Sequence, residues 1–179
     1  MAGTLNQLIV IDVEATCWED RPPEHEASEI IEIGLCVVDV QRRERVSRER
    51  LLVRPTHSRV SPCCTQLTTL TQAQVDQGLP FAEACRHLEQ RSRTRQRTWA
   101  SYGDDDRRQF ERQCQREGVR YPFGPTHLHI KSLFGLIATL EDEVSLAQAL
   151  DRYGLRYDGT PHRGVDDAWN IARLVLQLF

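Results

Sequence analysis

The chain has 179 residues, of which 40% are hydrophobic and 27% are charged, and its formal net charge is −3. This balance is typical of a globular domain with a sizeable core, and it argues against a chain that is a basic nucleic-acid binder throughout. No segment approaches the roughly 20 apolar residues of a membrane span. The first residues, MAGTLNQ, lack the basic start and apolar region of a secretory signal, so we expect a cytoplasmic protein whose six cysteines are free thiols.

The apolar run LIVIDVE at residues 8–14 ends on two acids with one residue between them. Its β-branched residues favour a strand, and side chains alternate along a strand, so Asp12 and Glu14 point to the same side. Because the run is apolar on both faces, we expect a central, buried strand. Two carboxylates at its end are costly unless paired, and oxygen ligands of this kind suit Mg²⁺. Alternatively, both acids lie past the strand end, in water or paired with arginines.

The remaining pattern predicts a mixed α/β sheet in one domain spanning residues 1–179, because three strands are followed by alternating strands and helices. Between the first two strands, residues 15–28 form an exposed polar loop, and a short polar turn after the second strand indicates an antiparallel hairpin. The predicted strands are 5–13, 30–40, 50–54, 98–102 and 127–132. The predicted helices are a short one between Thr71 and Gly78, then 81–91, 104–117, 133–140, 146–153 and 165–178.

Two later segments are also acidic, SYGDDD at 101–106 and HRGVDDA at 162–168. The ordered set of D-x-E, an acidic loop, and a histidine followed five residues later by aspartate resembles the DEDDh family of 3′–5′ exonucleases. The resemblance is closest to the branch of histone-mRNA and small-RNA exonucleases, and it covers nearly the whole chain. The segments that carry it are IDVEATC at 11–17, EIIEIG at 29–34, LTTLTQAQVD at 67–76, RRQFERQC at 107–114 and YDGTPHRGVDDAWNIAR at 157–173.

The resemblance implies a ribonuclease H-like fold, a mixed five-stranded sheet flanked by helices. It also implies metal-dependent hydrolysis of phosphodiester bonds at the 3′ end of RNA or single-stranded nucleic acid, with release of 5′-monophosphates. Two ions about 4 Å apart, Mg²⁺ with Mn²⁺ as a substitute, carry out such chemistry and need several carboxylates around them. The nucleic-acid partner is expected to be an RNA 3′ end, with no membrane association. The alternatives are a proofreading-type exonuclease on DNA, or a module of the same fold that binds or regulates without turnover.

The family pattern selects Asp12, Glu14, Asp106 and Asp167 as the metal ligands. The third ligand is assigned to Asp106 because relatives have an aromatic residue immediately before it. This chain departs from that pattern with another aspartate at 105. Asp104 is the second choice for this ligand, or it simply caps the helix.

The family spacing of five residues from His162 selects Asp167 as the fourth ligand. Asp167 also continues the apolar stripe of the last helix, whereas Asp166 lies on another side and is expected near the helix N-terminus, where its charge is favourable. His162 is implied to be the general base, catalytic together with Glu14, since a neutral imidazole accepts a proton near neutral pH. Standing alone, His162 would be read as an ordinary loop histidine in water.

Three further residues are candidates for binding the terminal nucleotide. Trp18 follows the first strand in an exposed loop, where it could stack on a base or pack on the prolines of its own loop. Leu67 and Thr68 match the family segment that lies against the terminal nucleotide, although leucine and threonine in a turn more often serve packing. Of the 23 basic residues only Lys131 is a lysine, and the arginines together could hold phosphates.

Overall fold

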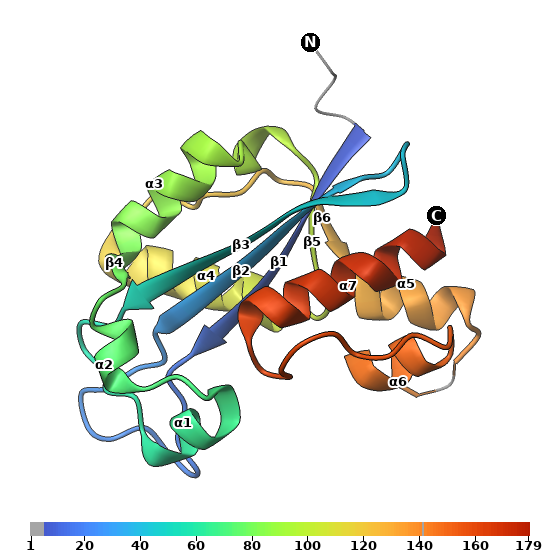
Figure 1. The fold of residues 1–179 in the computed structure, drawn as a ribbon. Coiled ribbons are helices and arrows are strands. Elements are labelled where there is room, and N and C mark those ends of the chain that lie inside the picture. Colours follow the sequence, from blue (N-terminus) through green and yellow to red (C-terminus); the bar gives the residue numbers. More distant parts are fainter. Residues whose placement is uncertain (1–5, 141) are drawn as a thin grey trace.

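A mixed sheet of six strands forms the centre of the computed structural model, which describes residues 6–140 and 142–179 (Figure 1). The strand order is β4-β3-β2-β1-β5-β6. β1 pairs antiparallel with β2, and β2 with β3, whereas β5 runs parallel to both β1 and β6. The strands are β1 (Gln7–Ala15), β2 (Ile30–Asp39), β3 (Glu44–Arg54), β4 (Leu79–Pro80), β5 (Trp99–Ser101) and β6 (His127–His129).

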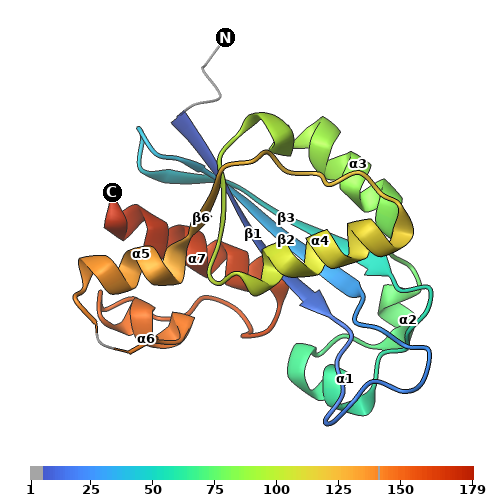
Figure 2. The same cartoon turned by 180° about the vertical axis from the view of Figure 1, so that it is seen from behind.

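Helices cover both faces of this sheet. Figure 1 shows α7, α5 and α6 on one side, and Figure 2, from behind, shows α3 and α4 on the other. Residues of β1 divide between the two cores as strand alternation predicts: Leu8 and Val10 pack with α7, and Ile9 and Ile11 pack with α3 and α4. The helical segments are α1 (Pro62–Thr68), α2 (Gln72–Val75), α3 (Phe81–Arg91), η2 (Thr94–Gln96), α4 (Asp105–Glu117), α5 (Ile130–Ile137), α6 (Leu146–Asp151) and α7 (Gly164–Leu178).

The mixed α/β fold with flanking helices is confirmed, but the expected number of five strands is wrong. The strand that was not predicted, β4, has two residues and pairs with the end of β3. Such a short edge strand that contains a proline carries no periodic signal in a sequence. The predicted start of the first strand at residue 5 lies outside the described residues.

Helix ends follow local signals closely. α3 has the predicted bounds, α4 ends at Gly118 in the left-handed conformation, and Thr71 with Gln74 forms the expected capping box of α2. Three larger differences remain: α5 begins at Ile130 inside the predicted last strand, α1 occupies a stretch predicted as a turn, and β3 begins at Glu44 where residue 50 was predicted. Within the described residues, no helix combines the length and apolar character needed to cross a bilayer.

Candidate metal centre

The acidic centre begins with β1, which carries Asp12 and Glu14 on one face at its C-terminal end. In the antiparallel register, Asp12 lies opposite Gly34 and Glu14 lies opposite Glu32 of β2. One carboxylate oxygen each from Asp12, Glu14 and Asp167 lies within 4.8 Å of the other two. Side chains from β1 and from α7, about 150 residues apart in sequence, therefore converge on one point.

Two glycines let α7 come close enough to β1 and β2 for this convergence. A Cβ atom on Gly34 would overlap the backbone carbonyl of Gly164, the first residue of α7. A Cβ on Gly164 would lie 2.9 Å from the carbonyl oxygen of Asp12. Any side chain at either position would push the helix away from the sheet, and Asp167 would move with it.

The remaining predicted ligand, Asp106, reaches the same strand from the first turn of α4. The Val13 amide donates a hydrogen bond of 2.8 Å to Asp106 Oδ1, and the Asp106 side chain is buried. Asp104 instead pairs with Arg107 and Arg108 and makes no side-chain capping bond. Asp105 is exposed. Of the three consecutive aspartates, Asp106 is the one that the structure brings to β1.

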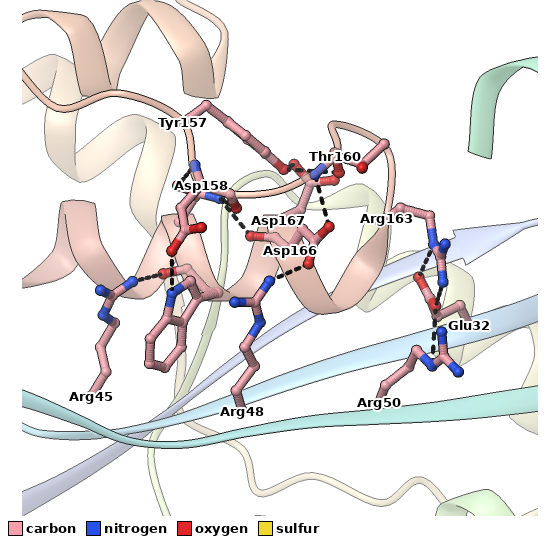
Figure 3. A network of polar contacts seen from close by, with 12 residues as sticks. Glu32, Arg45, Arg48, Arg50, Tyr157, Asp158, Thr160, Arg163, Asp166 and Asp167 are labelled. Carbon is pink, nitrogen blue, oxygen red and sulfur yellow. Dashed lines mark hydrogen bonds and ion pairs between the residues drawn. The ribbon is translucent and has the colours of Figure 1, made fainter. Parts of the chain in front are cut away.

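Asp166 and Asp167 take different partners on α7 (Figure 3). Asp167 accepts a hydrogen bond of 2.7 Å from the Tyr157 hydroxyl. Asp166 pairs with Arg48 of β3 and accepts a 2.8 Å bond from the Thr160 amide. Asp166 lies in the first turn of α7 as expected, but the N-cap residue is Arg163.

The four predicted ligands repel one another. Burial and the charges of neighbouring carboxylates raise the pKa of Asp12 well above its ordinary value. Burial, followed by the charges of Asp167 and other carboxylates, raises the pKa of Glu14 to about 8, and burial raises that of Asp106 to about 7. The pKa of Asp167 is also raised by burial, against the opposing effects of the Tyr157 hydroxyl and of His162. A cation bound among these oxygens would relieve the repulsion, so the donor set fits a hard divalent ion such as Mg²⁺.

His162 lies in the exposed loop immediately before α7. Its backbone φ is +61°, in the left-handed region that non-glycine residues seldom adopt. His162 precedes Asp167 by five residues, and its charge and its backbone act to lower the pKa of Asp167. The loop that presents His162 is tied to α7 through the Thr160 amide and Asp166.

The predicted nucleotide-binding residues have different environments. Trp18 is half-buried in the loop after β1, and Leu67 on α1 is 44% exposed. Figure 1 shows α1 beyond the C-terminal end of β1, the end that carries the acids. Thr68 does not fit the prediction, because its side chain is fully buried: its hydroxyl donates to the Cys64 carbonyl (2.8 Å) and accepts from the Leu70 amide (3.1 Å). The Thr68 hydroxyl therefore supports the end of α1 from within.

Two residues beside the centre, Glu32 and Arg163, were not predicted from the sequence. The Glu32 side chain is fully buried, and Arg163 binds it through two guanidinium nitrogens (Figure 3). An acidic residue inside the apolar run EIIEIG was the available signal, because a glutamate in a buried strand needs a cationic partner. The arginine that pairs with this glutamate lies 131 residues further along the chain.

Comparisons with known proteins agree with this geometry. Residues 9–175 match the sequence model of the family RNase_T, described as exonuclease. The 3′-5′ exoribonuclease 1 of Homo sapiens is 30% identical over 181 residues, which cover 96% of this chain and 52% of that protein. The 3′-5′ exonuclease Snipper of Drosophila melanogaster is 27% identical and is covered to 68%. The chain thus spans about half the length of the exoribonuclease 1 proteins that it matches.

A solved structure supports the same relationship. The nuclease domain of 3′hExo, described as a DEDDh family member bound to rAMP, superimposes with a TM-score of 0.88 at 29% identity. The match covers 97% of this chain and 91% of that one. The ribonuclease H-like arrangement inferred from the sequence is therefore shared with a solved exonuclease domain.

Proposed function

Because this chain belongs to the RNase_T exonuclease family and has DEDDh-type relatives, we propose that it removes nucleotides one at a time from the 3′ end of RNA, with two bound metal ions. The observation that carries the proposal is the convergence of Asp12, Glu14 and Asp167, with one oxygen of each within 4.8 Å of the others. Asp106, held on the Val13 amide, adds a fourth carboxylate to this centre. These acids have no ion-pair partner in the described part of the chain, which supports a role in binding cations.

Each residue of the centre is proposed to have a distinct role in hydrolysis. Asp12, Glu14, Asp106 and Asp167 would hold two Mg²⁺ ions, which Mn²⁺ can replace and which, when bound, supply charge neutralisation and activation of water. The imidazole of His162 accepts a proton from the attacking water. A new bond forms between the water oxygen and phosphorus, the bond from phosphorus to the 3′ oxygen breaks, and that oxygen leaves with a proton. The products are a nucleoside 5′-monophosphate and a chain one nucleotide shorter.

RNA is the proposed substrate because the relatives of this chain include proteins named 3′-5′ exoribonucleases. The 2′-hydroxyl is the group that distinguishes an RNA end from a DNA end. Trp18 and the exposed Leu67 are the proposed contacts with the terminal nucleotide, since both lie on segments near the acidic end of β1.

A panel of labelled oligonucleotides tests this function. RNA and DNA of one sequence, labelled at the 3′ or the 5′ end, would be incubated with Mg²⁺, Mn²⁺ or EDTA, with Asp12→Asn as the control for contaminating nuclease. We expect 3′ label to be released at once as mononucleotide and 5′-labelled RNA to shorten stepwise, only with a divalent ion. A strong preference for DNA would favour the proofreading-type alternative. Nucleic-acid binding without cleavage would favour the non-catalytic module, and undiminished cleavage in EDTA would contradict the metal requirement.

A further inference from the structure

Glu32 is a fifth carboxylate beside the acidic centre, and it is not one of the proposed metal ligands. It lies in β2 directly opposite Glu14, and its side chain is fully buried. Its charge adds to the repulsion that raises the pKa of both Asp12 and Glu14. A buried carboxylate that increases this repulsion is expected only where a cation binds it with good geometry.

Arg163 supplies that cation with the fork of its guanidinium group. Nη2 lies 2.8 Å from Glu32 Oε1, and Nε lies 3.3 Å from Oε2 (Figure 3). The remaining nitrogen, Nη1, donates a bond of 3.3 Å to Thr69 Oγ1. One side chain therefore connects β2 and the end of α1 to the start of α7, and a two-pronged contact fixes the direction of the arginine as well as its distance.

Arg163 is also the residue that follows His162. His162 has a left-handed backbone, and a non-glycine residue stays in that conformation only when its surroundings hold it there. On the N-terminal side of His162, Thr160 is anchored to Asp166. On the C-terminal side, Arg163 is held by its fork to Glu32 and by its carbonyl oxygen, which accepts bonds of 2.8 Å from the Asp166 and Asp167 amides. The exposed His162 therefore lies between two residues that are each held by contacts with the rest of the fold.

We propose that Glu32 and Arg163 form a positioning pair that holds His162 in place beside the acidic centre. The inference rests on the proposed function, because it assigns the pair a role in presenting the general base. Neither residue acts on the substrate; the pair works through the backbone of His162. Arg163 also faces Glu14 with a favourable charge, so the experiment must separate positioning from a direct electrostatic effect.

Arg50 offers a matched control for the charge. Its Nε lies 3.9 Å from Glu32 Oε1, but it belongs to β3, is 48% exposed, and has no connection to the His162 loop. Arg163→Leu and Arg50→Leu therefore remove the same charge beside the same carboxylate, and only the first releases the loop. Because Arg163→Leu leaves Glu32 buried without its main partner, the double variant Glu32→Leu with Arg163→Leu is included to keep the fold.

The test is a double-mutant cycle with His162→Ala, measured on an RNA oligonucleotide. In the wild-type background, Arg163→Leu and the Glu32/Arg163 double variant should lower kcat by about 10- to 100-fold, because a displaced general base loses its alignment. The KM should change by less than about threefold, and Arg50→Leu should stay within about twofold in kcat. In the His162→Ala background, Arg163→Leu should lower kcat by less than about twofold, because the side chain through which it acts has already been removed. Equal losses in both backgrounds would overturn the proposal.

Hydrogen exchange in the metal-free protein gives a reading that does not depend on activity. Amides of residues 162–165 should exchange faster in Arg163→Leu and in the double variant than in wild type, and Arg50→Leu should leave them unchanged. Unchanged exchange in the Arg163 variants would overturn the positioning role. If the wild-type protein had no exonuclease activity, the proposed function would fail while this measurement still decided whether the pair holds the loop.

Discussion

Neighbouring carboxylates around the end of β1 take opposite partners. One set, the acidic centre, faces other carboxylates and forms no ion pair in the described part of the chain; the other set is held by arginines. The division separates Asp167 from Asp166, Asp106 from Asp104, and Glu14 from Glu32. In the first two cases the members of the two sets are one or two residues apart, and in the third they lie on adjacent strands.

Glu14 and Asp104, one from each set, show opposite pKa shifts. Burial raises the pKa of Glu14 to about 8, whereas hydrogen bonds from Arg107 lower the pKa of Asp104 to about 2. Carboxylates with arginine partners stabilise the fold without a bound ion. Repulsion among the carboxylates of the acidic centre instead lowers the free energy of unfolding of the metal-free protein. The absence of an internal counter-charge, more than acidity itself, therefore distinguishes the proposed metal ligands from the other carboxylates.

The largest expected effect separates Asp167 from Asp166. Asp167→Asn should abolish measurable turnover, a loss of roughly 10⁴-fold in kcat, because a metal ligand supports several kcal/mol of transition-state stabilisation. Asp166→Asn is the matched control, because the asparagine oxygen can still accept the bond from the Thr160 amide that holds the His162 loop. It should keep kcat within about threefold and cost about 1 kcal/mol of unfolding free energy by weakening the pair with Arg48. Single-turnover kinetics and thermal unfolding measure the two quantities. Similar kcat losses in two folded variants would erase the distinction between the sets.

The next effect concerns His162, which belongs to neither set. His162→Ala should lower kcat by roughly 10²- to 10⁴-fold, the usual contribution of a positioned general base. Binding of Mn²⁺ and of RNA should survive, because the four carboxylates remain in place. Calorimetric titration and single-turnover rates would be compared with wild type. A variant within a few fold of the wild-type rate would show that His162 has no part in proton transfer.

A stability measurement tests the repulsion within the acidic centre. Glu14 and Asp106 have native pKa values of about 8 and about 7, above their ordinary values, so the metal-free native state binds more protons than the unfolded state between about pH 4 and pH 8. The free energy of unfolding should therefore fall as pH rises through this window. Asp12→Asn should flatten this dependence and raise the Tm of the metal-free protein at pH 8. Saturating Mg²⁺ should stabilise wild type and not the variant; a wild-type Tm independent of both pH and Mg²⁺ would contradict the comparison.

The smallest expected effect is at Asp104. Asp104→Asn should leave kcat within about twofold and lower the Tm by no more than about 3 °C, because its arginine partners are exposed and such pairs contribute little. Asp106→Asn is the contrasting variant and should lose turnover to nearly the same extent as Asp167→Asn. If Asp104→Asn were the inactive one, the ligand from α4 would have to be reassigned.

Local signals in the sequence predicted a large part of this protein. The alternation of LIVIDVE placed Asp12 and Glu14 on one face of a central strand, and this follows from backbone geometry alone. Pro80 predicted the start of α3 and Gly118 predicted the end of α4 for the same reason, since both signals act within a few residues. The ordered motifs indicated the exonuclease family.

Which carboxylates lack a counter-charge depends on contacts that form in the folded chain. Arg48 pairs with a carboxylate 118 residues away in sequence, and Arg163 with one 131 residues away. Contacts between residues so far apart give no periodic pattern in a sequence. The same holds for β3, whose charged first half reads as a turn but forms a strand because β2 pairs with it along its length. Tertiary contacts also buried Thr68, which sequence motifs alone had placed at the substrate. The sequence determined the chemical groups and their faces, and long-range packing determined the charges that surround them.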